Sequence, residues 1–341
     1  MGNPSPSEWA KLYQIAGQFQ KVSPWTWMVN GDLFAVVNPQ NGEVGYCSIL
    51  GNGKEEFGLG IFLGDKGYKR YLSIFSDKPG VEEFDETIMT PMLSLLFANR
   101  EDLQRQDIEV IRSLGLQFRG KNAWPLFRSQ KPGYAPWFLE KEEAIFLTVA
   151  IEQALAVAGK VRDDKLDLYE GVDEDLVFTR YYSDGKWKED WRKPEFSQRS
   201  SSKKPEESTA IVNEAEMLLL RNSSPRQGGS WELDISILPI PIGPKSSRPY
   251  FPLCFLAVER QQGMVIGVEM NEPWITQSQQ REVFIKILKN AGQLPHDIRV
   301  KSKKVKEILE PIAISLGINI PVGAIPKLER FKASLDNQLS G

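Results

Sequence analysis

The chain has 341 residues, of which 41% are hydrophobic and 26% charged, which is ordinary globular composition and enough length for two domains. Its net charge of −3 excludes a global basic field that would draw it to nucleic acid or anionic membranes, although a local basic patch stays open. Cys47, Cys254 and His296 are the only cysteines and histidine, so a Cys/His zinc site is excluded and a reducing cytoplasm is expected. The longest apolar run, residues 145–158, is interrupted by polar side chains, so no membrane segment is expected.

Residues 1–194 are predicted to form an aromatic-rich α+β domain. An amphipathic helix opens it, and short strands with Asn-Gly turns follow, without regular alternation of strands and helices. We expect the first helix to carry its apolar face from Trp9 to Phe19, and later helices over residues 81–98, with a kink at Pro91, and 140–159. Strands are expected at residues 25–28, 33–37, 44–47, 57–63, 68–75, 176–182 and 187–191.

Residues 195–230 are predicted to be a linker. The segment from residue 195 to 208 is rich in Ser and Lys and has no apolar periodicity, which is typical of a solvated connection. A short helix over residues 206–221 is expected within this linker.

Residues 231–341 follow a cleaner order, β-β-β-α-β-α-β-α, which predicts an α/β domain. Glycines end two of the helices, at Gly292 and Gly317. Strands are expected at residues 231–238, 253–259, 264–270, 298–300 and 318–322, and helices at 276–291, 303–316 and 326–339.

This C-terminal order resembles the ribonuclease H-like fold of retroviral integrases and insertion-sequence transposases, in which the first strand lies beside the fourth. The resemblance implies that Asp234 is the first catalytic carboxylate and Glu329 the third, whereas Lys301 occupies the place of the second. The segments that carry it are residues 231–234, 257–260 before Gly263, 265–269, 291–292, 295, 297–301, 317–318, and 328–331 ahead of Leu335.

Lys301 decides how this resemblance is interpreted. Two-metal phosphoryl transfer needs several carboxylates around two Mg²⁺ ions about 4 Å apart, and an ammonium group adds positive charge at their centre. We therefore expect Lys301 to be the counter-ion of Asp234, and Asp234 and Glu329 to be catalytic remnants that bind no metal or other cofactor. Glu259 and Glu269 are candidate substitute ligands, although polar positions at strand ends and on an exposed face are the simpler explanation.

The whole chain resembles an uncharacterised two-domain family of bacterial proteins, known from firmicutes and cyanobacteria, which brings no activity with it. The residues that carry this resemblance are 24–28, 32–34, 42–47, 57–59, 231–234, 248–250 and 263.

The favoured interpretation is a cytoplasmic, non-catalytic binding or regulatory protein whose partner is a protein or a nucleic acid. One alternative is an Mg²⁺- or Mn²⁺-dependent nuclease that uses Asp234 and Glu329. Another is a protein-interaction module that uses the many tryptophans of the N-terminal domain, which are otherwise explained as core residues. Arg299, Lys303 and Lys304 form a basic cluster near a predicted helix start and are the candidate nucleic-acid-binding residues, with a solvated helix face as the simpler explanation.

Overall fold

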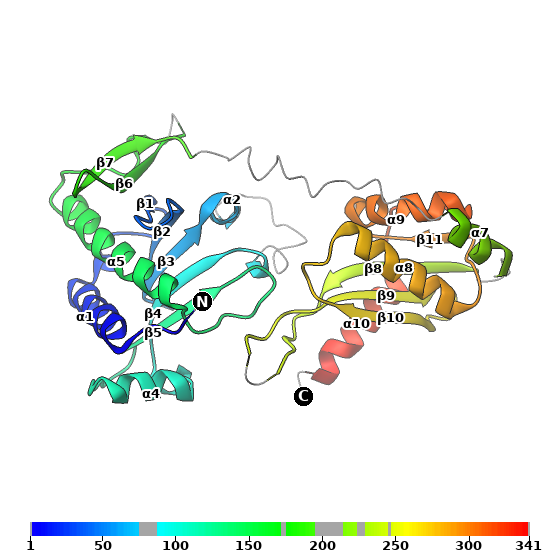
Figure 1. Ribbon diagram of the computed structural model, residues 1–341, viewed down its shortest axis with the longest axis horizontal. Coiled ribbons are helices and arrows are strands. Elements are labelled where there is room, and N and C mark those ends of the chain that lie inside the picture. Colours follow the sequence, from blue (N-terminus) through cyan, green and yellow to red (C-terminus); the bar gives the residue numbers. More distant parts are fainter. Residues whose placement is uncertain are drawn as a thin grey trace. The chain divides into compact units, whose positions relative to one another are not determined.

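The computed structural model describes residues 2–74, 87–171, 175–194, 214–223, 229–244 and 247–339, with backbone alone at 223 and 335–339. The chain divides into two compact units, Met1–Ser197 and Gln198–Gly341. Each unit has its own β-sheet and its own hydrophobic core (Figure 1). The protein is therefore a mixed α/β structure with two sheets.

The N-terminal unit is built on a seven-stranded sheet with the order β5-β4-β3-β2-β1-β6-β7. Neighbouring strands are antiparallel except β1 and β6, which are parallel. The strands are β1 (Phe34–Val37), β2 (Val44–Leu50), β3 (Gly58–Leu63), β4 (Met92–Ala98), β5 (Trp124–Gln130), β6 (Val177–Ser183) and β7 (Lys186–Arg192).

Helices cover both faces of this sheet. On one face, α1 (Pro6–Val22) and α5 (Lys141–Arg162) pack against each other and against the main core. On the other face, α2 (Gly64–Ile74) packs on β2 and β3, where the rings of Tyr68 and Tyr46 are in contact. A further helix, α4 (Arg105–Ser113), is joined to β5 by a bidentate contact in which Arg128 donates to both carboxylate oxygens of Asp107, at 2.9 and 2.7 Å.

Six of the seven tryptophans of this unit are partly buried against the main core. Trp25, for example, contacts the rings of Phe19, Phe57 and Phe97. The core explanation of the aromatic content therefore fits these rings, which are Trp9, Trp25, Trp27, Trp124, Trp187 and Trp191.

Helix α5 is long and apolar enough to cross a membrane by length and composition, and it is the one such helix among the described residues. However, 56% of its most apolar window is buried inside the unit. Core helices of globular proteins pass the same test, and α5 has eight residues in the main core, from Ala144 to Ala158. Its apolar character is thus explained by packing.

Several predicted elements of this unit were wrong. The expected strand over residues 68–75 is the helix α2, and residues 92–98 of the expected helix 81–98 form the strand β4. The described part of that expected helix begins at residue 87. The expected strand 25–28 is a 3-10 turn at Pro24–Thr26, and α4 and β5 were not predicted. The remaining strands and the first and last helices were confirmed to within a few residues.

The C-terminal unit has a four-stranded sheet with the order β10-β9-β8-β11. β8 and β11 are parallel, which confirms that the first and fourth strands are neighbours, and the other pairs are antiparallel. The predicted fifth strand is reduced to two bridges, from Asp297 of β11 to Asn319 and from Val300 to Val322. The strands are β8 (Ser230–Ile237), β9 (Leu253–Glu259), β10 (Val265–Asn271) and β11 (Asp297–Arg299).

Three helices of this unit sandwich its sheet. α8 (Gln277–Ala291) and α9 (Lys303–Leu316) bury residues such as Phe284 and Leu309 in the core with Trp231 of β8. α10 (Pro326–Leu339) lies on the opposite face, where Leu328 packs against Leu256 of β9. The three predicted helices and their limits were confirmed.

The expected linker contains part of this core. Helix α7 (Glu214–Ser223) packs on α9, and its Met217 and Leu220 are buried in the same cluster as Trp231. Residues 214–223 therefore belong to the C-terminal unit, which differs from the predicted boundary at residue 231. The rest of the predicted linker, apart from residues 229 and 230, lies outside the described residues.

Candidate functional site

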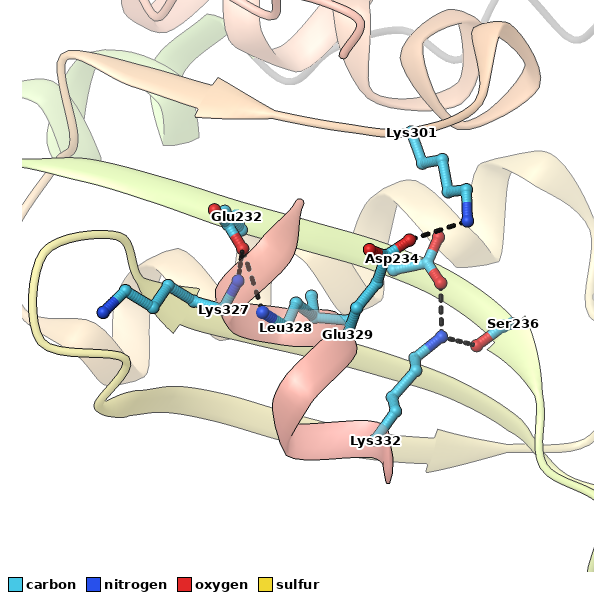
Figure 2. A network of polar contacts seen from close by, with 8 residues as sticks. All are labelled: Glu232, Asp234, Ser236, Lys301, Lys327, Leu328, Glu329 and Lys332. Carbon is cyan, nitrogen blue, oxygen red and sulfur yellow. Dashed lines mark hydrogen bonds and ion pairs between the residues drawn. The ribbon is translucent and has the colours of Figure 1, made fainter. Parts of the chain in front are cut away.

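The candidate site lies between the middle of β8, the start of α9 and the first turns of α10 (Figure 2). Side chains alternate between the faces of a strand, so Glu232, Asp234 and Ser236 share one face of β8. Asp234 is paired in register with Leu256, which packs with α10, so this polar stripe faces α10. The structure thus brings a row of polar side chains under a helix that carries Glu329 and Lys332.

Asp234 forms an ion pair with Lys332, and this lysine also donates a hydrogen bond to Ser236 Oγ at 2.5 Å. The side chains of Asp234 and Lys332 are 15% and 29% exposed, so the pair is partly withdrawn from solvent. Lys332 was not singled out from the sequence. Its position three residues after Glu329 places both side chains on the same side of α10, and that spacing was the available signal.

Lys301, which follows β11, pairs with Glu329 of α10 at a distance of 2.7 Å between Nζ and Oε1. This corrects the expected ion pair, because Lys301 was predicted to be the counter-ion of Asp234. The side chains of Lys301 and Glu329 are 49% and 47% exposed, so water screens their attraction. Each of the two predicted carboxylates therefore has a lysine of its own (Figure 2).

Glu232 is the most deeply buried charged residue of the site, with 0% of its surface exposed. Its Oε2 accepts hydrogen bonds from the backbone N–H groups of Lys327 and Leu328, at 2.8 and 2.9 Å. Those groups belong to the first turn of α10, where backbone donors have no acceptor within the helix. Glu232 thus caps α10 from the sheet, which the sequence could not indicate because the two segments are far apart in the chain.

The second carboxylate oxygen of Glu232, Oε1, has no hydrogen-bond partner among the described residues. A buried oxygen of this kind costs free energy, which the two N–H bonds and the positive end of the helix dipole offset. The carboxylate is therefore held at its place by α10 itself.

These residues do not fit the two magnesium ions that the resemblance implies. Asp234 and Glu329 are each neutralised by an ammonium group, and Glu232 already binds the helix. Among the residues that the structure describes, no group of three or more His, Cys, Asp or Glu side chains could hold a metal ion. Hard dications need uncompensated oxygen ligands, so the arrangement offers them no favourable site.

The candidate substitute ligands are engaged elsewhere. Glu259 accepts the backbone N–H groups of Gln262 and Gln261, at 2.6 and 2.7 Å, and these bonds lower the pKa of its carboxyl. Glu269 pairs with Lys286 of α8 at 2.7 Å. Neither side chain is part of the polar stripe of β8, so both have structural explanations.

The predicted basic cluster lies at the start of α9. Lys303 and Lys304 are exposed in its first turn, and Ser302 caps it by accepting the backbone N–H of Lys304 at 3.1 Å. Arg299 is half-buried beside Gly323, and its Nε has no partner among the described residues. The cluster therefore adjoins Lys301 in sequence and presents two exposed cations.

Two family models match this chain. A model described as a domain of unknown function, DUF7309, matches residues 9–180, which is half of the chain. The chain belongs to the DUF7309 family. A second model, also described as a domain of unknown function, DUF6930, matches residues 218–336. Its match begins inside α7, in agreement with the place of that helix in the C-terminal unit.

No curated protein matches the sequence. Among solved structures, the HTLV-2 integrase catalytic core domain in complex with magnesium is similar in its dimeric form, with 16% identity and a TM-score of 0.26 over 34% of this chain and 72% of that one. The trimeric form gives 17% identity and a TM-score of 0.26, over 34% and 71%. A simian T-cell lymphotropic virus intasome in complex with PP2A regulatory subunit B56 gamma gives 14% identity and a TM-score of 0.26, over 34% and 40%. These values are too low to say more than that part of the fold is similar.

Proposed function

We propose that this protein is a non-catalytic binding protein whose C-terminal unit is a ribonuclease H-like domain with a disabled metal site. The order of its elements supports the fold, since three antiparallel strands precede a fourth that is parallel to the first, with helices on both faces. The positions of Asp234 on β8 and Glu329 on α10 support the comparison with a nuclease site. The resemblance of the whole chain implies a bacterial protein, and the scarcity of cysteines favours the cytoplasm.

The observation that carries this proposal is the pair of ammonium groups in the site. Lys332 pairs with Asp234 and Lys301 pairs with Glu329, so the four charges sum to zero. An Mg²⁺ ion entering this site would have to displace a lysine and would be repelled by both. The two ion pairs instead hold α10 on the sheet, so the role of Asp234 and Glu329 is structural.

We propose nucleic acid as the first partner to test. Residues 198–341 carry 19 Lys and Arg against 15 Asp and Glu, whereas residues 1–197 carry 23 against 30. The C-terminal unit is therefore basic although the whole chain is acidic, and the exposed Lys303 and Lys304 add two cations beside the former catalytic position. Neutralised phosphates would supply sequence-independent affinity.

The loss of catalysis is tested on the full chain with DNA and RNA in the presence of Mg²⁺ or Mn²⁺. We expect no metal-dependent cleavage and no calorimetric metal binding that is lost in Asp234→Asn. Cleavage that disappears in Asp234→Asn but persists in Ser236→Ala would show a working nuclease and would refute the proposal.

The partner class is tested by fluorescence anisotropy with labelled nucleic acid across a salt series. The double substitution Lys303→Glu and Lys304→Glu should weaken binding and reduce its salt dependence. A matched control, Lys186→Glu and Lys188→Glu on β7, makes the same change of charge in the N-terminal unit and should have little effect. Equal losses in both variants, or no binding at all, would exclude this patch and leave a protein partner.

A further inference from the structure

The two sheets of this chain end in four edge strands, and three of these edges are blocked. The outer side of β5 is bridged to Trp137 through two hydrogen bonds of 2.8 Å, and β11 and the residue that follows it are bridged to Asn319 and Val322. β7 is rich in charge, with lysines at positions 186 and 188, which discourages pairing with another strand. Proteins commonly protect their edges by such means.

The fourth edge, β10, is neither bridged to another segment nor rich in lysine in the part of the chain that the structure describes, and its one irregularity is a register shift against β9 between Val265 and Gly267. It is seven residues long, contains no Pro, Lys or Arg, and is the last strand of its sheet. Its single charged side chain, Glu269, is neutralised by Lys286. An edge of this kind presents a row of main-chain donors and acceptors to another extended strand.

β10 also carries an exposed apolar row. Val265, Val268 and Met270 are 38%, 44% and 56% exposed. They are paired in register with Val258, Leu256 and Cys254 of β9, which are buried in the cluster formed with α10. Paired residues of antiparallel strands share a face, so the exposed row lies on the α10 side of the sheet. α10 itself packs on β8 and β9.

The charges at the two ends of β10 are opposite. Lys327 lies over the turn that precedes the strand, with its Cδ 3.6 Å from the position of a Cβ on Gly263. Glu272 is exposed just after the strand and accepts a hydrogen bond from Trp274 at 2.8 Å. Neither Lys327 nor Glu272 has an ion-pair partner among the described residues; Glu259 is within electrostatic reach of Lys327 but binds backbone N–H groups.

We propose that β10 pairs with the β10 strand of a second copy of this chain, antiparallel and about a two-fold axis near Val268. Centred there, the turn before β10 of one copy lies beside the end of β10 of the other, so Lys327 of each copy approaches Glu272 of its partner. The apolar rows of the two copies meet on one face. The four-stranded sheet of one copy joins that of the other, which gives one sheet of eight strands. This complementarity of end charges favours a second copy over an unrelated peptide, and a two-fold axis makes the contact twice.

The first test is the mass of the full-length protein by sedimentation equilibrium over a concentration series. We expect a reversible dimer that Val268→Lys converts to a monomer, because the substitution buries an ammonium group at the axis. The matched control is Leu219→Lys on α7, which changes a 70% exposed apolar residue and should leave the dimer intact. Circular dichroism establishes that each variant is folded.

The second test exchanges the end charges. Lys327→Glu and Glu272→Lys should each weaken the dimer about tenfold or more, since each creates two like-charge contacts. Mixing the two single variants should restore association, because every contact then joins opposite charges. If Lys327 and Glu272 did not face each other across a two-fold axis, mixing the two variants would not restore association.

The third test is cross-linking. Val268→Cys should form an intermolecular disulfide on mild oxidation, since directly opposed residues of antiparallel strands have Cα atoms about 4.5–5.5 Å apart. Cys47 and Cys254 are buried and should not contribute. A monomer at every concentration, a dimer insensitive to Val268→Lys, or a mixture of charge variants that stays dissociated would each overturn the proposal.

Discussion

Replacing Glu232 with alanine should destabilise the C-terminal unit by about 3 kcal/mol. The substitution leaves the N–H groups of Lys327 and Leu328 buried without an acceptor, at a cost of roughly 1–3 kcal/mol each. It also removes the favourable interaction with the helix dipole, about 1 kcal/mol. Relief from burying a carboxylate with one unpartnered oxygen offsets part of this loss.

Two matched variants separate the causes. Glu232→Gln keeps the shape and an oxygen acceptor, so it should lose only the charge assistance, about 1 kcal/mol. Glu259→Ala also removes an acceptor of two backbone N–H bonds, but in an exposed turn where water replaces it, so it should cost less than about 1 kcal/mol.

The assay is hydrogen exchange of the α10 and β8 amides, because two units that unfold separately would blur a global unfolding curve. We expect the α10 amides to exchange fastest in Glu232→Ala, more slowly in Glu232→Gln and most slowly in the wild-type protein. If Glu232→Ala exchanged like the wild-type protein, or if Glu259→Ala were equally damaging, the capping role of Glu232 would be refuted.

Asp107→Ala should destabilise the N-terminal unit by about 3 kcal/mol, because it leaves the 12% exposed Arg128 without its carboxylate, whereas Glu109→Ala on the same helix breaks an exposed pair and should cost under about 0.5 kcal/mol. Thermal melts of the two variants measure the difference, and similar melting temperatures would contradict it. Burial raises the pKa of Cys47 and Tyr13 above their ordinary values of 9.0 and 10.0, so the folded protein keeps neutral forms that the unfolded chain ionises. Stability should be full below about pH 9 and fall above it; a constant free energy of unfolding up to pH 10.0 would disagree.

The C-terminal helices were predictable because the residues that start and end them lie close to them in the sequence. Thr276 and Ser302 cap the starts of α8 and α9 with their side chains, and Gly292 and Gly317 end them in the left-handed conformation. These signals act within a few residues of the chain, so the sequence alone contains them.

The N-terminal errors arose where tertiary packing gives a residue its role. Gly67 falls between the strands expected over residues 57–63 and 68–75, but a Cβ there would lie 2.5 Å from the backbone of Phe62, so glycine permits the close approach of α2. Tyr68 and Tyr71 are three residues apart and both buried, which is helical spacing. β4 is buried on both faces, so its apolar run lacks the alternation of a half-exposed strand.

The site was predicted in part. Asp234, Glu329 and Lys301 do gather at one place, but the partner of each acid depends on the rotation of α10, which no local pattern specifies. Lys332 supplies the ammonium that Lys301 was expected to give. The capping by Glu232 joins residues 95 and 96 positions apart, and such long-range contacts are not encoded in periodicity.

The contact of Glu232 with α10 has a consequence for the order in which the chain is completed. β8 is synthesised early in its unit and α10 last, so Glu232 has no N–H donors until the final helix emerges. A product truncated before Pro326 would leave a carboxylate facing the apolar residues of β9 that α10 covers in the complete unit. Such fragments would therefore be poorly folded and open to cellular proteolysis.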